Sequence, residues 1–171
     1  MKKRNLIVLF GLMLSFSACS AAEDPAAVLE KSRTLLAGEP QFSLQFTAAA
    51  VEAEATLTWG AGEQTLHFEA PDSVAGLSIS RSESGLSLSL DGVSAKVSAG
   101  ALVDSSAAQQ LFDALDGISA ADAESGELSV EDGLLQLDFD GLSLWLDAES
   151  GEPLALEGEE FSCQLSVISD L

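Results

Sequence analysis

The chain has 171 residues, of which 47% are hydrophobic and 6% aromatic, and this composition argues against disorder and suits a folded domain with a substantial core. It carries 28 acidic side chains against 7 basic ones, a net charge of −21, which argues against binding to nucleic acid or to anionic lipid surfaces. The acidic residues are scattered, which leaves two interpretations open: a solvated outer face, or a surface that meets a cationic partner such as a basic protein or peptide.

The first 18 residues have the layout of a secretory signal peptide. Lys2, Lys3 and Arg4 form a positively charged start, and an apolar run from Leu6 to Phe16 follows it. The run is shorter than the roughly 20 residues that a membrane-spanning helix needs. The rest of the chain is therefore expected to fold outside the cytoplasmic membrane.

The signal ends in Phe16-Ser17-Ala18-Cys19, which resembles the lipobox of bacterial lipoproteins. In that family the Cys thiol receives a diacylglyceryl group and becomes the N-terminus, and two acyl chains are enough for stable anchoring. The resemblance implies a signal peptide over residues 1–18, a lipidated tether over 19–24 and a single domain over 25–171. Acyl chains on Cys19 would hold this domain at the extracytoplasmic face of the cell membrane. The alternative is an ordinary cleaved signal followed by an incidental Cys.

An amphipathic helix is expected to follow Asp24, which is a favourable N-cap. Pro25 suits the first helical position, and Gly38 suits the end of the helix. The apolar residues between them fall on one face, which can lie on a sheet. Lys31 and Arg33 are expected to point away from that face.

From Gln41 onward the apolar residues repeat every second position, which is typical of strands with one buried face and one solvated face. Turn signals such as Pro71-Asp72, Asp91-Gly92 and Asp132-Gly133 separate the short runs. Because the spacing is short, most connections are expected to be antiparallel hairpins.

A second helix interrupts the strands. Ser106 and Gln109 form a capping-box pattern, apolar residues then repeat at three and four positions, and Gly117 is expected to end the helix before a loop over 119–126. The strands then return, for a total of about eleven strands and two helices. In one of them Trp145 falls on the face opposite its leucine neighbours, which makes it a candidate surface contact.

This order of elements resembles the half-barrel fold of the lipoprotein carrier LolA, the outer-membrane receptor LolB and related mycobacterial lipoproteins that hold lipids. The local resemblance lies in the helix that leads into Phe42-Ser43-Leu44-Gln45-Phe46-Thr47, and in the strand–turn–strand segment 146–154. It implies an α+β fold in which a curved antiparallel sheet of about eleven strands wraps around two helices, with an apolar cavity for acyl chains between them. The close similarity is to small lipoproteins of Gram-positive bacteria whose roles are mostly unassigned.

The carriers of this family have a cavity-facing arginine that helps to hold the lid. Arg33 and Arg81 are the only arginines after the signal, and neither sits in a matching motif, so that role is not transferred to them. The inward positions of the expected strands and second helix supply the candidate lining of a cavity, although the same residues would equally suit a filled core. These candidates are Leu57, Leu66, Leu77, Leu88, Phe112, Leu115, Leu137 and Leu144.

The sequence predicts no enzyme, cofactor or metal site. His67 is the only histidine and is expected to face solvent, and neither a nucleophile-elbow motif nor a zinc-ligand spacing is present. Asp138 and Asp140 share one side of a strand, which more often indicates solvation than glycosidase machinery. Cys163 alternates with apolar residues and is expected to be a buried free thiol.

Two functions therefore remain. The first is a membrane-anchored extracytoplasmic lipoprotein that binds or carries a hydrophobic ligand, a lipid or the acyl chain of a lipoprotein. The alternative is a non-catalytic interaction or structural lipoprotein of the cell envelope, with a filled core and an acidic surface for a cationic protein partner.

Overall fold

The structure is a computed structural model that describes residues 23–48, 51–97, 107–122, 128–139, 141–159 and 161–169. The predictions for the signal peptide, for Cys19 and for Asp140 lie outside these residues. The elements are α1 (Pro25–Ala37), α2 (Ala107–Ala120), β1 (Gln41–Ala48), β2 (Val51–Trp59), β3 (Glu63–Ala70), β4 (Ser78–Ser82), β5 (Gly85–Leu90), β6 (Val93–Val97), β7 (Val130–Glu131), β8 (Leu134–Phe139), β9 (Leu142–Asp147), β10 (Pro153–Glu157) and β11 (Phe161–Val167).

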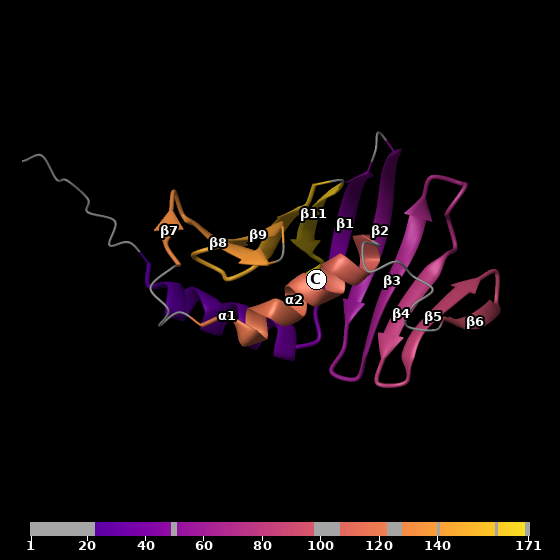
Figure 1. Cartoon of the computed structure of the whole chain (residues 1–171), viewed down its shortest axis with the longest axis horizontal. Helices are drawn as coiled ribbons and strands as arrows, with labels where there is room; N and C mark the ends of the chain where they lie inside the picture. The colour runs from indigo at the N-terminus through magenta and orange to yellow at the C-terminus, as the bar shows by residue number, and fades with distance from the viewer. Residues whose placement is uncertain are drawn as a thin grey trace, which may run out of the picture.

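The eleven strands form one antiparallel sheet in the order β6-β5-β4-β3-β2-β1-β11-β10-β9-β8-β7. Strands that follow one another in sequence are paired, except β6 and β7, which form the two edges, and the pairing of β1 with β11 joins the two halves of the sheet. Figure 1 shows the sheet bent into two wings, with α1 against the wing of β7–β11 and α2 running from that wing across the middle of the sheet. This arrangement confirms the predicted α+β fold with eleven antiparallel strands and two helices.

Helix α1 begins and ends where the sequence predicts. The Asp24 carboxylate accepts a hydrogen bond from the backbone N–H of Ala26 at 3.1 Å, and the N–H of Gly38 returns to the last turn of the helix. The buried face of α1 includes Ser32, whose hydroxyl lies 2.6 Å from the carbonyl oxygen of Gly151. Helix α1 is therefore fixed to the turn between β9 and β10.

Helix α2 is longer than the sequence indicates, because it continues past Gly117 to Ala120. The expected end at Gly117 is therefore wrong, and so is the start of the expected loop at residue 119. Gly117 faces the ring of Phe139, and a Cβ at this position would lie 2.7 Å from ring atom Cε1. The glycine thus serves close packing between α2 and β8 rather than the end of the helix.

Candidate functional site

Most of the predicted cavity-lining residues form the packed layer between the helices and the sheet. Their exposed fractions are 0 or 1%, so in this conformation they border no space wide enough for a water molecule. This packing agrees with the filled-core alternative, and a ligand would have to separate α2 from the sheet to reach them. The residues are Leu57, Leu66, Phe112, Leu115, Leu137 and Leu144.

The other two predicted lining residues are half-buried. Leu77 precedes β4, and Leu88 lies within β5. Leu88 belongs to a row of directly opposed residues that crosses the sheet on its concave face, the side on which the two helices lie. In order across the sheet, these residues are Leu57, Leu66, Ile79, Leu88 and Ala95. The exposure rises along this row, from 0% at Leu57 and Leu66 to 8% at Ile79, then half-buried at Leu88 and exposed at Ala95.

The concave face is therefore covered at its centre and uncovered toward β6. Figure 1 shows β5 and β6 at the far end of their wing, past the end of both helix ribbons. Leu90 is 48% exposed and Val93 is 74% exposed, and the two residues are paired across the turn between these strands. We call the concave side chains of β5 and β6 the open apolar face; they are Leu86, Leu88, Leu90, Val93, Ala95 and Val97.

Arg81 marks the boundary between the covered and the uncovered parts of the concave face. It pairs with Gln64 on β3 and with Leu86 on β5. Its guanidinium reaches α2, with Nη1 2.9 Å from Oδ1 of Asp113 and Nη2 2.6 Å from Oδ2 of Asp116. Its Nε donates to Oε1 of Gln64 at 3.1 Å, so Arg81 joins three elements.

Arg33 contacts the C-terminal end of the same helix. Its Nη2 donates to the carbonyl oxygen of Ala121 at 2.6 Å and its Nε to that of Ile118 at 3.3 Å, which satisfies carbonyl groups at the C-terminus of α2. Lys31 also contacts protein, because its ammonium group donates to the carbonyl oxygens of Ala148 and Glu149. Lys31 and Arg33 lie off the buried face of α1, as expected, and their long side chains reach around the helix to neighbouring carbonyl groups.

Arg33 and Arg81 thus both hold α2 in place, a role that the sequence analysis missed. One local signal was available for Arg81. It stands two positions after Ile79, on the apolar side of its strand, where a charged residue needs a specific partner. For Arg33 no such signal exists, because its partners lie 85 and 88 residues away in the sequence.

The candidate contact residue Trp145 is half-buried on β9, on the face opposite the buried Leu144 and Leu146. It is paired with Gln136 on one side and with Ala155 on the other. The large hydrophobic side chains that are exposed among the described residues are Leu90, Val93 and Ile168.

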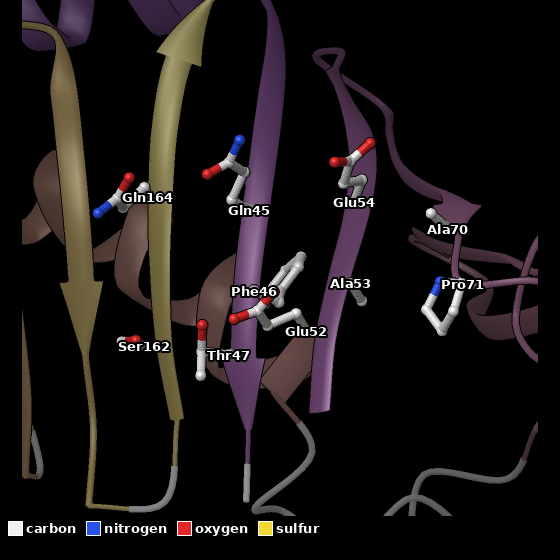
Figure 2. Close-up of a pocket in the computed structure, with 10 residues that line it drawn as sticks. All are labelled: Gln45, Phe46, Thr47, Glu52, Ala53, Glu54, Ala70, Pro71, Ser162 and Gln164. Carbon is white, nitrogen blue, oxygen red and sulfur yellow. The ribbon is translucent and has the colours of Figure 1, made fainter. Parts of the chain in front are cut away.

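A hollow of about 410 Å³ lies over the outer face of the sheet, where β11, β1 and β2 run side by side. Figure 2 shows Gln45, Glu54 and Gln164 side by side on adjacent strands above the hollow. Glu54 is opposed to Gln45, and Glu52 is opposed to Thr47. No basic side chain lines this hollow, and neither glutamate has an ion pair or side-chain hydrogen bond to another described residue.

The titratable groups that the sequence singled out do not form a reaction centre. His67 is exposed, as expected, and its Nδ1 lies 2.9 Å from the hydroxyl of Ser78. Hydrogen bonds from Ser143 and Gln136 lower the pKa of Asp138 on the outer face. Burial raises the pKa of the Cys163 thiol to about 12, which makes it a poor nucleophile.

Two further kinds of site are absent from the described residues. No group of three His, Cys, Asp or Glu side chains among them is arranged to hold a metal ion. In the same part of the chain, neither helix has the length and apolar character that crossing a membrane requires.

No protein-family model matches the chain, and no curated protein matches it. The solved structures that are similar to it in fold include two of low sequence identity. A LolA superfamily protein from Nitrosomonas europaea is 13% identical, with a TM-score of 0.41, over 88% of this chain and 96% of that one. An uncharacterized conserved protein from Thermus thermophilus is 11% identical, with a TM-score of 0.48, over 83% of this chain and 84% of that one. At these identities and scores the likeness concerns the general course of the chain and assigns no function.

Proposed function

We propose that this protein is a lipid-anchored extracytoplasmic lipoprotein that holds a hydrophobic ligand against its open apolar face. The ligand class is an acyl chain, either of a lipid or of another lipoprotein. The observation that carries the proposal is the exposure gradient along the concave face, from 0% at Leu66 to 74% at Val93. Burial of apolar area is worth about 25 cal/mol per Å², and a contiguous exposed apolar surface marks a contact site.

The chemistry of the open apolar face suits an acyl chain better than a polar ligand. Its side chains are leucine, valine and alanine, and the serines of the same strands lie on the opposite side of the sheet. The face continues without a break into the packed core, because Leu86 and Leu88 contact the core residues. A flexible chain that lies along this face would therefore extend the existing core by one layer.

An acyl anchor on Cys19 would favour an exchange of ligand away from the membrane that holds the protein. Four residues span at most about 14 Å, so an acylated Cys19 would lie within this distance of Glu23. Glu23 precedes α1, and in Figure 1 α1 and β6 lie at opposite ends of the molecule. The open apolar face would then be directed away from its own anchor, where a donor or acceptor of the ligand can approach.

The test compares two substitutions on neighbouring positions of β5. The full chain is purified from membranes, and its affinity for a fluorescent fatty acid is measured by titration, with bound lipids identified by extraction and mass spectrometry. Leu88→Asp should weaken binding at least tenfold, because it places a carboxylate on the open apolar face. Ser89→Asp, on the opposite side of the same strand, should leave binding unchanged. Equal affinities of both variants and the parent chain would refute the proposal.

The alternative function, a non-catalytic envelope interaction lipoprotein, is favoured by a different observation. The core beneath α2 is filled, and the outer hollow presents Glu52 and Glu54 without a basic counterpart among the described residues. A cationic partner segment would find two free carboxylates there. If this is the function, the chain should capture an oligolysine peptide more weakly at 0.5 M than at 0.05 M salt, because screening removes the attraction.

The charge-matched comparison for this alternative uses two double variants. Glu52→Gln with Glu54→Gln should reduce oligolysine capture several-fold. Glu131→Gln with Glu159→Gln removes the same charge from exposed positions elsewhere and should reduce capture only slightly. Equal losses in both would show that the attraction is a property of the net charge and would count against a site at the hollow.

A further inference from the structure

The two edges of the sheet differ in what they offer to another chain. One edge is β7, which has only two residues. The other is β6, which has five residues and no neighbouring strand on its outer side among the described residues. Proteins usually protect such an edge with proline, with charges or with a bulge. Strand β6 has no proline, and its one charged residue is Lys96.

Strands β5 and β6 and the turn between them carry no net charge in an otherwise acidic chain. Residues 85–97 contain one acidic side chain, Asp91, and one basic side chain, Lys96, whereas Arg81 on the neighbouring β4 is already paired with Asp113 and Asp116 of α2. The whole chain has 28 acidic and 7 basic residues, so a second copy is repelled from most other parts of the surface. Two copies approach each other with the least electrostatic cost through this end.

Strand β6 is complementary to itself in the antiparallel orientation. A two-fold axis at Ala95 places Val93 opposite Val97 of the second copy, and Ser94 opposite Lys96. Residues that are directly opposed lie on the same side of a sheet, so the apolar side chains of both copies meet on the concave side. The same surface thus serves both partners, as an isologous dimer interface requires.

We propose that two copies of this chain pair through their β6 strands into one continuous sheet. The backbone groups on the outer side of β6 gain hydrogen-bond partners, and the exposed Val93 of each copy gains an apolar neighbour. The two open apolar faces join into one trough that is twice as long as that of a single copy. The pairing itself requires no ligand, so it stands or falls independently of the proposed lipid binding.

The test uses the two-fold axis. In the full chain, Ala95→Cys brings two thiols face to face, because opposed Cα atoms of antiparallel strands lie about 4.5–5.5 Å apart, a distance that suits a disulfide. Mild oxidation of membranes that contain this variant should convert most of it to a covalent dimer on a non-reducing gel. Ser43→Cys, at an exposed position on the central strand β1, is the matched control and should stay largely monomeric. The parent chain serves as the blank for Cys19 and for the buried Cys163.

Sedimentation measures the oligomeric state directly and does not depend on the folding of the cysteine variant. The parent chain in detergent should sediment as a dimer at about 50 μM, and Val93→Lys should sediment as a monomer because it opposes a charge to Val97 of the second copy. A monomeric parent chain, or equal cross-linking of Ala95→Cys and Ser43→Cys, overturns the proposal. Cross-linking of Ala95→Cys to a different protein overturns it as well, because it assigns the edge to another partner.

Discussion

The guanidinium of Arg81 lies over the ring of Phe112, with its Cζ 4.9 Å from the ring centroid. The same group forms ion pairs with Asp113, which follows Phe112 directly, and with Asp116, one turn further along α2, and its side chain is only 17% exposed. A planar cation that stacks on a ring and bonds two carboxylates at once is held in one orientation. Arg81 therefore fixes the position of α2 above the sheet, next to the open apolar face.

Removal of this group should loosen α2. We expect Arg81→Gln to lower the free energy of unfolding by about 2 kcal/mol, because the stacking contact and the charge-assisted hydrogen bonds are lost together. Amide exchange within α2 should accelerate more than exchange within β1. Urea unfolding and hydrogen exchange measure the two effects.

Two variants serve as controls for Arg81. Arg81→Lys keeps the charge but lacks the planar guanidinium that donates to two carboxylates at once. It should therefore recover about half of the stability that Arg81→Gln loses. Asp113→Asn should cost less than about 1 kcal/mol, because the carboxylate is more than half exposed. If Arg81→Gln unfolds at the same urea concentration as the parent chain, the arginine does not hold the helix.

Gly117 provides a prediction about packing. We expect Gly117→Ala to lower the free energy of unfolding by about 1–3 kcal/mol, although alanine favours helices, because the added Cβ would overlap the ring of Phe139. Gly62→Ala is the matched control, since no atom lies within 4 Å of its added Cβ, and it should change stability by less than about 0.5 kcal/mol. A stabilised Gly117→Ala variant would show that β8 can move away from α2.

Local patterns predicted the elements because each of them is encoded within a few residues. The Asp-Gly turns at 91–92 and 132–133 have positive φ at all four residues, as two-residue hairpins require. The alternation that begins at Phe42 identifies which side of each strand faces the core, and the strand register agrees with it. The capped start of α1 at Asp24 was equally local.

Long-range relationships were not available from those patterns. Alternation places Leu66 and Leu88 on the same side of the sheet, but it does not say that α2 covers the first and leaves the second half-exposed. Whether a concave leucine packs or lines a space depends on where a helix distant in the sequence comes to lie. Gly117 was misread for the same reason, because its partner Phe139 belongs to a different element.

Cys163 should behave as an inert thiol until the protein unfolds. Burial raises its pKa to about 12, so almost no thiolate forms in the folded chain at pH 8. We expect a disulfide-exchange reagent to label Cys163 only as fast as the sheet opens, and labelling should follow the urea unfolding curve. Rapid labelling without urea would show that β11 opens locally.

The same shift has a consequence at high pH. Because the folded-state pKa of Cys163 lies above the unfolded value, the buried neutral thiol contributes stability that is complete below about pH 9 and is lost as the pH rises toward 12. The Cys163→Ala variant lacks this titration, so its stability should fall less steeply between pH 9 and pH 11. If the free energy of unfolding, measured with urea, falls equally steeply with pH in the parent chain and in Cys163→Ala, this assignment is wrong.

Asp147 links the last large turn to helix α1. The backbone N–H and the hydroxyl of Ser150 donate to its carboxylate at 2.7 and 2.8 Å and lower its pKa. Since the folded-state pKa lies below the unfolded value of about 3.8, the contribution of Asp147 is present above that pH and is lost as the pH falls through the folded-state value. The contribution should be less than about 1 kcal/mol, because Asp147 is only partly buried and solvent screens its charge.

The turn that Asp147 organises presents the carbonyl oxygen of Gly151 to the buried hydroxyl of Ser32. We therefore expect Asp147→Ala to lower stability at pH 6 and to speed amide exchange in α1 as well as in the turn. Urea midpoints measured from pH 2.5 to pH 6 should show that Asp147→Ala loses less stability at low pH than the parent chain does. The side chain of Glu149 is exposed in the same turn, so Glu149→Ala should lose as much stability at low pH as the parent chain does. An identical acid loss in the parent chain and Asp147→Ala would mean that other carboxylates govern stability at low pH.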